Sequence, residues 1–293
     1  MTMLTISGRR GPSRRRLERL WRARRLEARA CQLRDAGRYP KAEPLLRRAL
    51  ALAERAPDSL AVAGGLNSLG ILYKALGRYD EAEPLYRRAL SLLEAAQGPW
   101  SLDVASVYHN LGGLEHARGR CAAGEPLARR AVIIRAAILG PDHPDVAADQ
   151  AALAALLDGQ GKYAEAEALY RRALVIFERA LGPDHYELSF SLNNLAAIAH
   201  ARGEYAAAEA GYRRALAIKE RELGPDHPDV AMTLNNLAAC YQAQGRYREA
   251  AALYQRALAI LGARLAADHP DLLLCRENYE LLRAQARRRE SRR

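Results

Sequence analysis

Four histidines are the residues of this sequence that most resemble a chemical site, because they recur every 42 positions: His143, His185, His227 and His269. A zinc site needs several ligand atoms within about 2 Å of one ion, whereas equivalent positions in stacked pairs of helices lie about 10 Å apart. One ion therefore cannot bind several of these imidazoles. Polar side chains at helix starts commonly cap the helix. We predict capping histidines, no metal ion and no other cofactor.

No other set of residues matches a catalytic motif. The sequence has neither H-E-x-x-H nor G-x-S-x-G, and Gly161-Lys162 is followed by Tyr163, so it is not a phosphate-binding loop. The cysteines are too far apart for a C-x-x-C motif, and we interpret them as reduced, mostly buried thiols: Cys31, Cys121, Cys240 and Cys275. The sequence therefore predicts a non-enzymatic protein.

A repeat predicts the elements that position these residues. Turns that begin with glycine recur at intervals of 40 to 42 residues: Gly37, Gly77, Gly119, Gly161, Gly203 and Gly245. An apolar stripe with helical spacing precedes each later turn, as in 234–241, and a second stripe follows it, as in 166–174. Each unit is therefore predicted to be a hairpin of two helices, with glycine ending the first helix.

The linkers between hairpins carry stop and start signals. Gly-Pro-Asp-His-Pro-Asp occurs at 140–145 and at 224–229; Gly-Pro ends one helix, and the second proline suits the first turn of the next. An isolated hairpin cannot bury both stripes, so neighbouring hairpins must stack. The predicted fold is all-α, a right-handed α-solenoid. It comprises a basic tail (1–16), six helix-turn-helix repeats (17–270), a capping helix (271–289) and a second basic tail (290–293), with thirteen helices in total.

These residues resemble a known repeat family. Small and large apolar residues at fixed places in the hairpin resemble the tetratricopeptide repeat: Leu237, Ala238, Tyr241, Ala250, Tyr254 and Ala257. The 42-residue period, Leu-Asn-Asn-Leu-Ala at 192–196, Leu-Tyr-Arg-Arg-Ala-Leu at 169–174 and the linker are similar to the kinesin-light-chain type over about 20–285. The N-terminal units depart from the pattern: the third has His109-Asn110 and the fourth Ala151-Ala152 in place of the asparagine pair.

The resemblance implies that the first helix of each repeat lines a concave groove that holds an extended peptide. The corresponding positions carry amides, imidazoles and a lysine: Asn67, Lys74, His109, His116, Asn193, His200, Asn235 and Gln242. An asparagine amide can donate to and accept from a peptide backbone. We therefore expect Asn67, Asn193 and Asn235 to contact the ligand, and the second asparagine of each pair to lock the repeats together.

The net charge of +11 is concentrated at the ends, with +8 in residues 1–35 and +5 in 281–293. We predict a scaffold for protein–protein interaction that binds an extended or short helical peptide of a partner in the groove. The alternative is an adaptor that associates with nucleic acid or anionic membrane through its Arg-rich ends. Binding of this kind would weaken steeply as the salt concentration rises, which distinguishes it from peptide binding. The sequence has no specific nucleic-acid motif, and self-association through the end repeats stays open.

No apolar stretch is long enough to cross a bilayer, and the first ten residues lack the apolar segment of a signal peptide. We therefore expect a cytoplasmic protein. The paired arginines of the second helices, such as Arg171-Arg172, are interpreted as a solvated face that nearby carboxylates partly neutralise.

Overall fold

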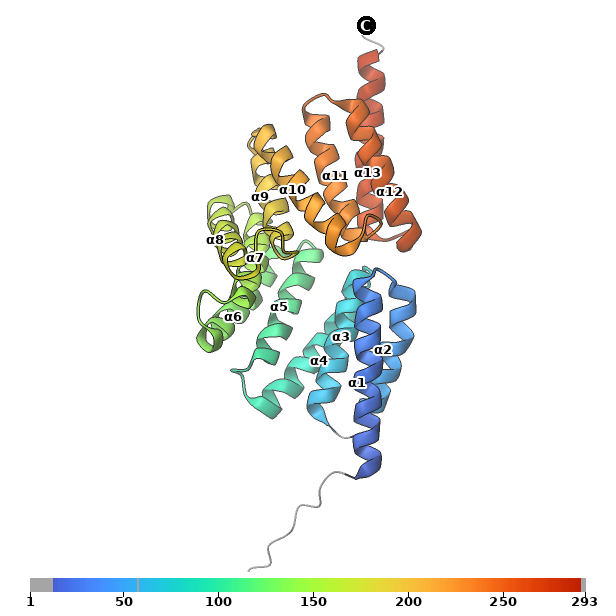
Figure 1. Ribbon diagram of the computed structural model, residues 1–293, viewed down its shortest axis with the longest axis vertical. Helices are drawn as coiled ribbons and strands as arrows, with labels where there is room; N and C mark the ends of the chain where they lie inside the picture. The colour runs from blue at the N-terminus through green and yellow to red at the C-terminus, as the bar shows by residue number, and fades with distance from the viewer. Residues whose placement is uncertain (1–12, 57, 291–293) are drawn as a thin grey trace, which may run out of the picture.

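The computed structural model describes residues 13–56 and 58–290, and within these ranges it contains thirteen α-helices and no strand. Twelve helices form six consecutive hairpins and the last stands alone (Figure 1). The hairpins are α1 (Arg14–Asp35) with α2 (Tyr39–Glu54), α3 (Ser59–Ala75) with α4 (Tyr79–Gln97), α5 (Leu102–Ala117) with α6 (Cys121–Leu139), α7 (Pro144–Asp158) with α8 (Tyr163–Leu181), α9 (Leu188–Ala201) with α10 (Tyr205–Leu223), and α11 (Pro228–Ala243) with α12 (Tyr247–Arg264); the last helix is α13 (Pro270–Glu290). The predicted all-α solenoid of six hairpins and a capping helix is confirmed.

The ends of some elements differ from the predicted ones. Helix α1 begins at Arg14 rather than at residue 17, because the Ser13 hydroxyl accepts a hydrogen bond from the Arg16 N–H and caps the helix. Helix α9 begins at Leu188, two residues after the predicted start, because Tyr186 stands where proline starts α7, α11 and α13. The rest of the predicted tails, residues 1–12 and 291–293, lies outside the described residues.

Each hairpin turn is built on a glycine in the left-handed region. The six turn glycines have φ between 66° and 79°, a conformation that penalises any side chain with a Cβ. The residue after the glycine then bonds back across the helix end, as the Arg246 N–H does to the Tyr241 carbonyl at 2.9 Å. This is the predicted helix stop.

Small residues let the helices approach closely. Alanines near the start of the second helices are fully buried: Ala82, Ala166, Ala208 and Ala250. A buried tyrosine follows four residues later in each: Tyr86, Tyr170, Tyr212 and Tyr254. Gly70 of α3 makes room for one of these rings, since a Cβ at Gly70 would lie 2.7 Å from Cε1 of Tyr86. Each interface thus depends on matched large and small side chains.

The first helices of the hairpins form the inner side of a curved array. Consecutive first helices contact one another along the whole series α1, α3, α5, α7, α9, α11 and α13, as the crowded inner side of a curve requires. The curvature is strong enough that α11, α12 and α13 return to lie end-on against α1, α2 and α3 (Figure 1). One hydrophobic cluster accordingly includes residues from the first three hairpins, the last two and α13.

Candidate functional site

Asparagine side chains connect neighbouring helices on the inner surface. The Asn110 amide donates to Asn67 Oδ1 at 2.8 Å, and Asn236 donates to Asn193 Oδ1 at 3.3 Å. Asn278 of α13 donates in the same way to Asn235 Oδ1 at 3.1 Å. Asn110 and Asn236, each the second of its pair, therefore link neighbouring hairpins, but through a side chain and not through the expected neighbouring backbone, whereas Asn194 accepts from the adjacent Asn193. We call this row of contacts the amide ladder.

An ionic cluster replaces the ladder in the middle of the array, where the fourth hairpin lacks the asparagine pair. Asp149 Oδ1 lies 2.7 Å from His109 Nδ1 and 2.7 Å from Arg135 Nη1. The Asp149 side chain is fully buried, whereas His109 is one-third exposed on the inner surface. A buried carboxylate is stable only when it is paired, so the contact with Asp149 fixes the orientation of the His109 ring.

Lys74 and His116 lie close together on the same surface. A Cβ on Gly113 would lie 3.1 Å from Lys74 Nζ, so this glycine gives the lysine room to extend over α5. Both side chains reach solvent inside the superhelix, but the surrounding protein withdraws them from bulk water. This desolvation lowers the pKa of Lys74, and desolvation together with the charge of Lys74 lowers the pKa of His116.

The structure brings the sequence-predicted site residues to this inner surface with different exposures. His116 is exposed, and six others are half-buried: Asn67, Lys74, His109, Asn193, His200 and Gln242. Asn235 is only 3% exposed. Gln242 donates to Gln285 of α13 at 2.9 Å and accepts from the Tyr254 hydroxyl at 3.2 Å.

Three of the linker histidines, His143, His227 and His269, cap the following helix, which confirms their predicted role; His185 bonds the loop before α9, whose N-cap is Glu187. Each Nδ1 accepts a hydrogen bond from the N–H two residues later, at 3.1 to 3.3 Å: His143, His185, His227 and His269. Within residues 13–56 and 58–290, no group of three or more His, Cys, Asp or Glu side chains could hold a metal ion. Three cysteines are buried and the fourth is half-buried; burial raises the pKa of the Cys275 thiol to about 11.

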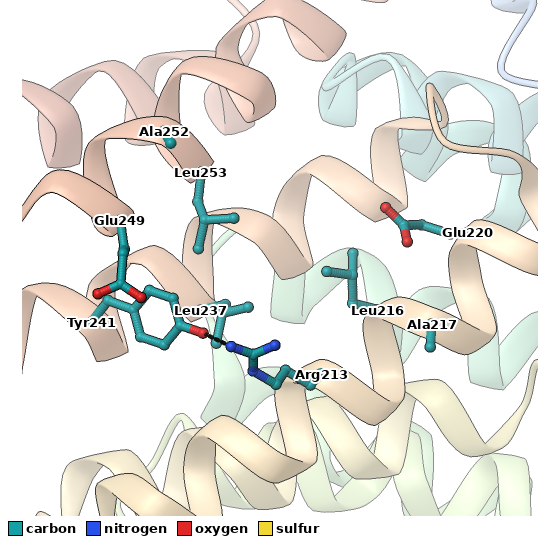
Figure 2. Close-up of a pocket in the computed structure, with 9 residues that line it drawn as sticks. All are labelled: Arg213, Leu216, Ala217, Glu220, Leu237, Tyr241, Glu249, Ala252 and Leu253. Atoms are coloured by element: carbon teal, nitrogen blue, oxygen red, sulfur yellow. Dashed lines mark hydrogen bonds between the residues drawn. The ribbon is translucent and has the colours of Figure 1, made fainter. Parts of the chain in front are cut away.

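Two notches on the outer side were not predicted from the sequence. One, between α10 and α12, is a cavity of about 400 Å³ with Leu237 and Leu253 among its lining residues (Figure 2). At its edge Arg213 donates to the Tyr241 hydroxyl at 2.6 Å, and Arg246 Cζ lies 3.8 Å from the centre of the tyrosine ring. The charged groups surrounding the ring are thus bonded within the protein.

The second notch, about 510 Å³, lies at the equivalent place between α2 and α4. Tyr73 takes the place of Tyr241, and Arg78 Cζ lies 4.1 Å from its ring. The intervening hairpins have Glu115, Leu157 and Ala199 at this position. A smaller cavity of about 210 Å³ lies at the equivalent place between α8 and α10 and is lined by Ala199, so the tyrosine is not a sequence signal for these cavities.

A model of the tetratricopeptide repeat family matches residues 22–95, 103–179, 150–221 and 187–263. Among solved structures, the crystal structure of BtubC (BKLC) from P. vanneervenii is 27% identical and covers 82% of this chain and 91% of that chain, with a TM-score of 0.52. A structure of kinesin light chain nearly identical TPR-like repeats from Podosopora anserina is 25% identical over 68% of this chain and 94% of that chain, with a TM-score of 0.48. A Rap protein complexed with Competence and Sporulation Factor is 14% identical over 91% of this chain and 76% of that chain, with a TM-score of 0.63.

No curated protein matched the chain. Among the helices that the structure describes, none is both long and apolar enough to span a membrane. The family model covers most of the chain, and its matches coincide with the hairpins described above. The chain therefore belongs to the tetratricopeptide repeat family, and its repeats are of the kinesin-light-chain-like type.

Proposed function

We propose that this protein binds an extended or short helical segment of a partner protein along its inner surface. Tetratricopeptide repeats form scaffolds for protein–protein interaction, and the observation that supports a groove here is the unused bonding capacity of the amide ladder. Asn193 accepts from Asn236 and donates to Asn194. Its amide has a second N–H and a second lone pair, which suit the carbonyl and N–H of a peptide backbone.

The roles of the predicted residues differ in this proposal. Asn67 and Asn193 bond the peptide backbone, whereas the buried Asn235 supports the ladder without direct contact. His109, held by Asp149, presents its other nitrogen to the ligand. Lys74 supplies positive charge, while His116, His200 and Gln242 form a polar row that extends towards the C-terminal end.

The experiment is to select binding peptides from a displayed random library with the full chain, and then to occlude the groove. Ala197 is half-buried on the inner face of α9, so Ala197→Arg fills the groove and is expected to weaken binding about tenfold or more. The matched control is Val175→Arg on the outer side, where Val175 is 63% exposed. Equal affinity of both variants and the natural chain, at unchanged helicity, would remove the groove assignment.

The exposed face of α1 supports a second candidate function, binding of an anionic polymer or membrane. Arg48 and three arginines of α1 surround Trp21 at a cavity of about 430 Å³. Four of the five residues equivalent to Arg48 pair with an acidic residue of the preceding hairpin or linker, at 2.7 to 3.4 Å: Arg88, Arg172, Arg214 and Arg256. The fifth, Arg130, lies over the Trp100 ring, with its Cζ 4.7 Å from the ring centre. Arg48 has no acidic partner among the residues that the structure describes, so an external anion would take this place.

Salt dependence tests this second function. Binding of single-stranded DNA and of anionic vesicles is measured at about 50 and 200 mM salt, where neutralisation of several phosphates predicts a loss of at least tenfold. Arg48→Gln is expected to weaken binding, whereas Arg87→Gln, whose arginine is paired with Glu83 at 2.7 Å, is the control. No binding at low salt would reject this candidate.

A further inference from the structure

The two ends of the array meet in a contact that a stack of neighbouring hairpins does not require. The turn of the first hairpin lies against the linker before α11, where a Cβ at Gly37 would come within 3.1 Å of Pro228 Cδ. The turn of the second lies against the linker before α13, where a Cβ at Gly77 would come within 2.9 Å of Pro270 Cδ. At the next three turns a Cβ would meet nothing within 4 Å: Gly119, Gly161 and Gly203. We call this contact the seam, with residues 35–39 and 75–79 on one side and 227–229 and 265–271 on the other.

Two of the four linker histidines contribute to the seam. His269 Nε2 lies 3.1 Å from the carbonyl oxygen of Ala75, a residue 194 positions away. The buried Nε2 of His227 lies beside the main chain of Asp35, which is the residue equivalent to Ala75. His227 and His269 are 7% and 4% exposed. His143, with the same sequence context and the same cap, stays at the surface, as does His185, which is followed by Tyr186 in place of proline.

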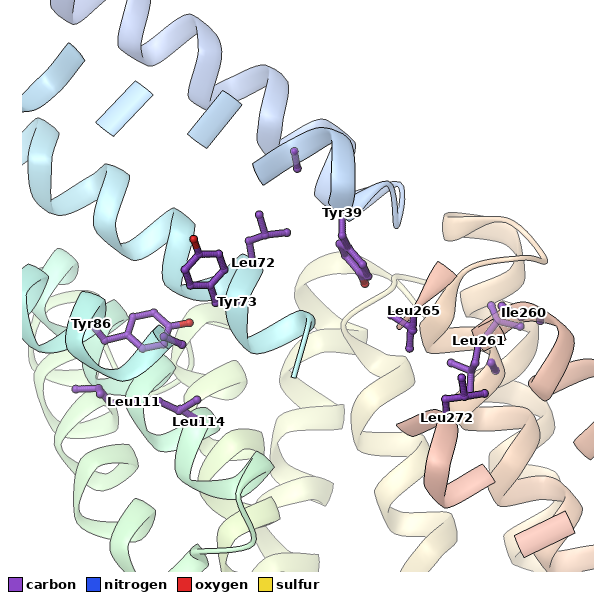
Figure 3. Close-up of a cluster of buried hydrophobic side chains, with 14 of the residues drawn as sticks. Tyr39, Leu72, Tyr73, Tyr86, Leu111, Leu114, Ile260, Leu261, Leu265 and Leu272 are labelled. Atoms are coloured by element: carbon purple, nitrogen blue, oxygen red, sulfur yellow. The ribbon is translucent and has the colours of Figure 1, made fainter. Parts of the chain in front are cut away.

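Tyr39 provides the apolar part of the seam. It begins α2 and is 6% exposed, whereas Tyr163 at the equivalent place in the fourth hairpin is 49% exposed. Figure 3 shows Tyr39 between the N-terminal helices and Leu265, in the hydrophobic cluster that joins both ends. Burial, and then the nearby carboxylates of Asp229 and Asp271, raise the pKa of Tyr39. The ring is therefore enclosed by the opposite side of the seam.

The seam differs physically from the interfaces within the stack. Between neighbouring hairpins, apolar stripes pack along whole helices, and each unit is stabilised by its neighbours. At the seam, turns and linkers meet end-on through two glycines, two prolines, two histidines and a few apolar side chains. Loss of the seam therefore leaves each nearest-neighbour interface intact. We propose that the seam is a latch, which opens and closes while the hairpins stay folded, and that its closure limits access to the inner surface.

The latch and the groove adjoin at the end of α3, and this part of the proposal rests on the proposed function. Lys74, which lines the groove, directly precedes Ala75, whose carbonyl lies against His269. Asp229 on the opposite side of the seam acts electrostatically on Lys74. A ligand that contacts Lys74 therefore touches the same helix end that the latch fixes, and a peptide enters the closed superhelix only after the seam has opened.

The test separates the seam from helix capping by matched variants. Asparagine is a good N-cap but has a shorter side chain than histidine, so His227→Asn/His269→Asn keeps the caps and removes the contact across the seam. His143→Asn/His185→Asn is the control at equivalent linkers. In small-angle X-ray scattering we expect a larger radius of gyration for the seam variant alone, with the far-UV circular dichroism of all three proteins unchanged.

A second pair tests the seam without changing a cap. Tyr39→Asp places a carboxylate near Asp229 and Asp271 and is expected to open the seam, whereas Tyr163→Asp is expected to have no effect on the radius. The latch is refuted if both seam variants keep the natural radius, or if they lose helicity, because the seam would then be part of the fold.

Access to the groove is measured separately, with the peptide obtained by library selection. Opening the seam is expected to raise the association rate constant about three- to tenfold, since binding would no longer wait for a conformational change. If a seam variant is expanded but its association rate constant is unchanged, the seam does not control access to the inner surface. If no peptide is selected at all, the proposed function fails, while the scattering result still decides whether the seam opens.

Discussion

Replacing Tyr39 with alanine is expected to destabilise the protein more than the same change at Tyr163. The two residues begin the second helix of their hairpins and are 6% and 49% exposed. An aromatic side chain buries about 200 Å², so about 85 Å² more of Tyr39 than of Tyr163 is covered. At about 25 cal/mol per Å² this difference is worth about 2 kcal/mol.

The assay is urea unfolding of both variants, followed by circular dichroism. A difference of about 2 kcal/mol corresponds to about 1 M in the urea midpoint for a denaturant slope of about 2 kcal/mol per M. Repeat arrays need not unfold in a single transition, so the midpoints are compared at equal slope. Equal shifts for the two variants would refute the reasoning, because the additional burial of Tyr39 would then contribute nothing.

Three further predictions concern buried groups. Burial lowers the pKa of His227, so the folded state favours the neutral imidazole. The contribution of His227 to the free energy of unfolding is complete above about pH 6.5 and is lost as the pH falls through the folded pKa. His227→Asn should therefore reduce the drop in urea midpoint between about pH 7.5 and about pH 5. Gly70→Ala forces a Cβ against the Tyr86 ring and should cost about 1–3 kcal/mol in urea unfolding, whereas Gly113→Ala meets only the flexible end of Lys74 and should cost less. Asp149→Asn removes the carboxylate between Arg135 and His109 and should cost about 3 kcal/mol; a loss below about 1 kcal/mol would show that this buried cluster is not an essential ion pair.

The local structure was predictable because each repeat carries its own signals. Glycines with positive φ end the first helices, and three of the four linker histidines cap the next ones, as residue type and spacing indicated. The amide ladder was only partly predictable, since the asparagine pair indicated locking but did not reveal that Asn236 bonds Asn193, 43 residues earlier. A contact between hairpins depends on how they stack, and one repeat does not contain that information.

The seam could not be predicted because it results from accumulated geometry. His143 and His227 have nearly identical neighbours in the sequence, yet the first has a side chain 40% exposed and the second is buried. Their difference arises from small rotations between hairpins, which add along the array until the last hairpin meets the first. The same reasoning explains the outer notches, which form between second helices and depend on the distance between them.

The amide ladder connects this accumulated geometry to ligand binding. Each ladder contact joins two consecutive first helices, as between Asn67 and Asn110 at 2.8 Å, and so helps to set the rotation from one hairpin to the next. A peptide that bonds the remaining N–H and lone pair of such an amide acts on the group that sets this rotation. A small change at each hairpin is summed along the solenoid and is largest where the two ends meet. The seam is therefore the contact that responds most strongly when a peptide binds in the groove, although it lies at the rim of the array.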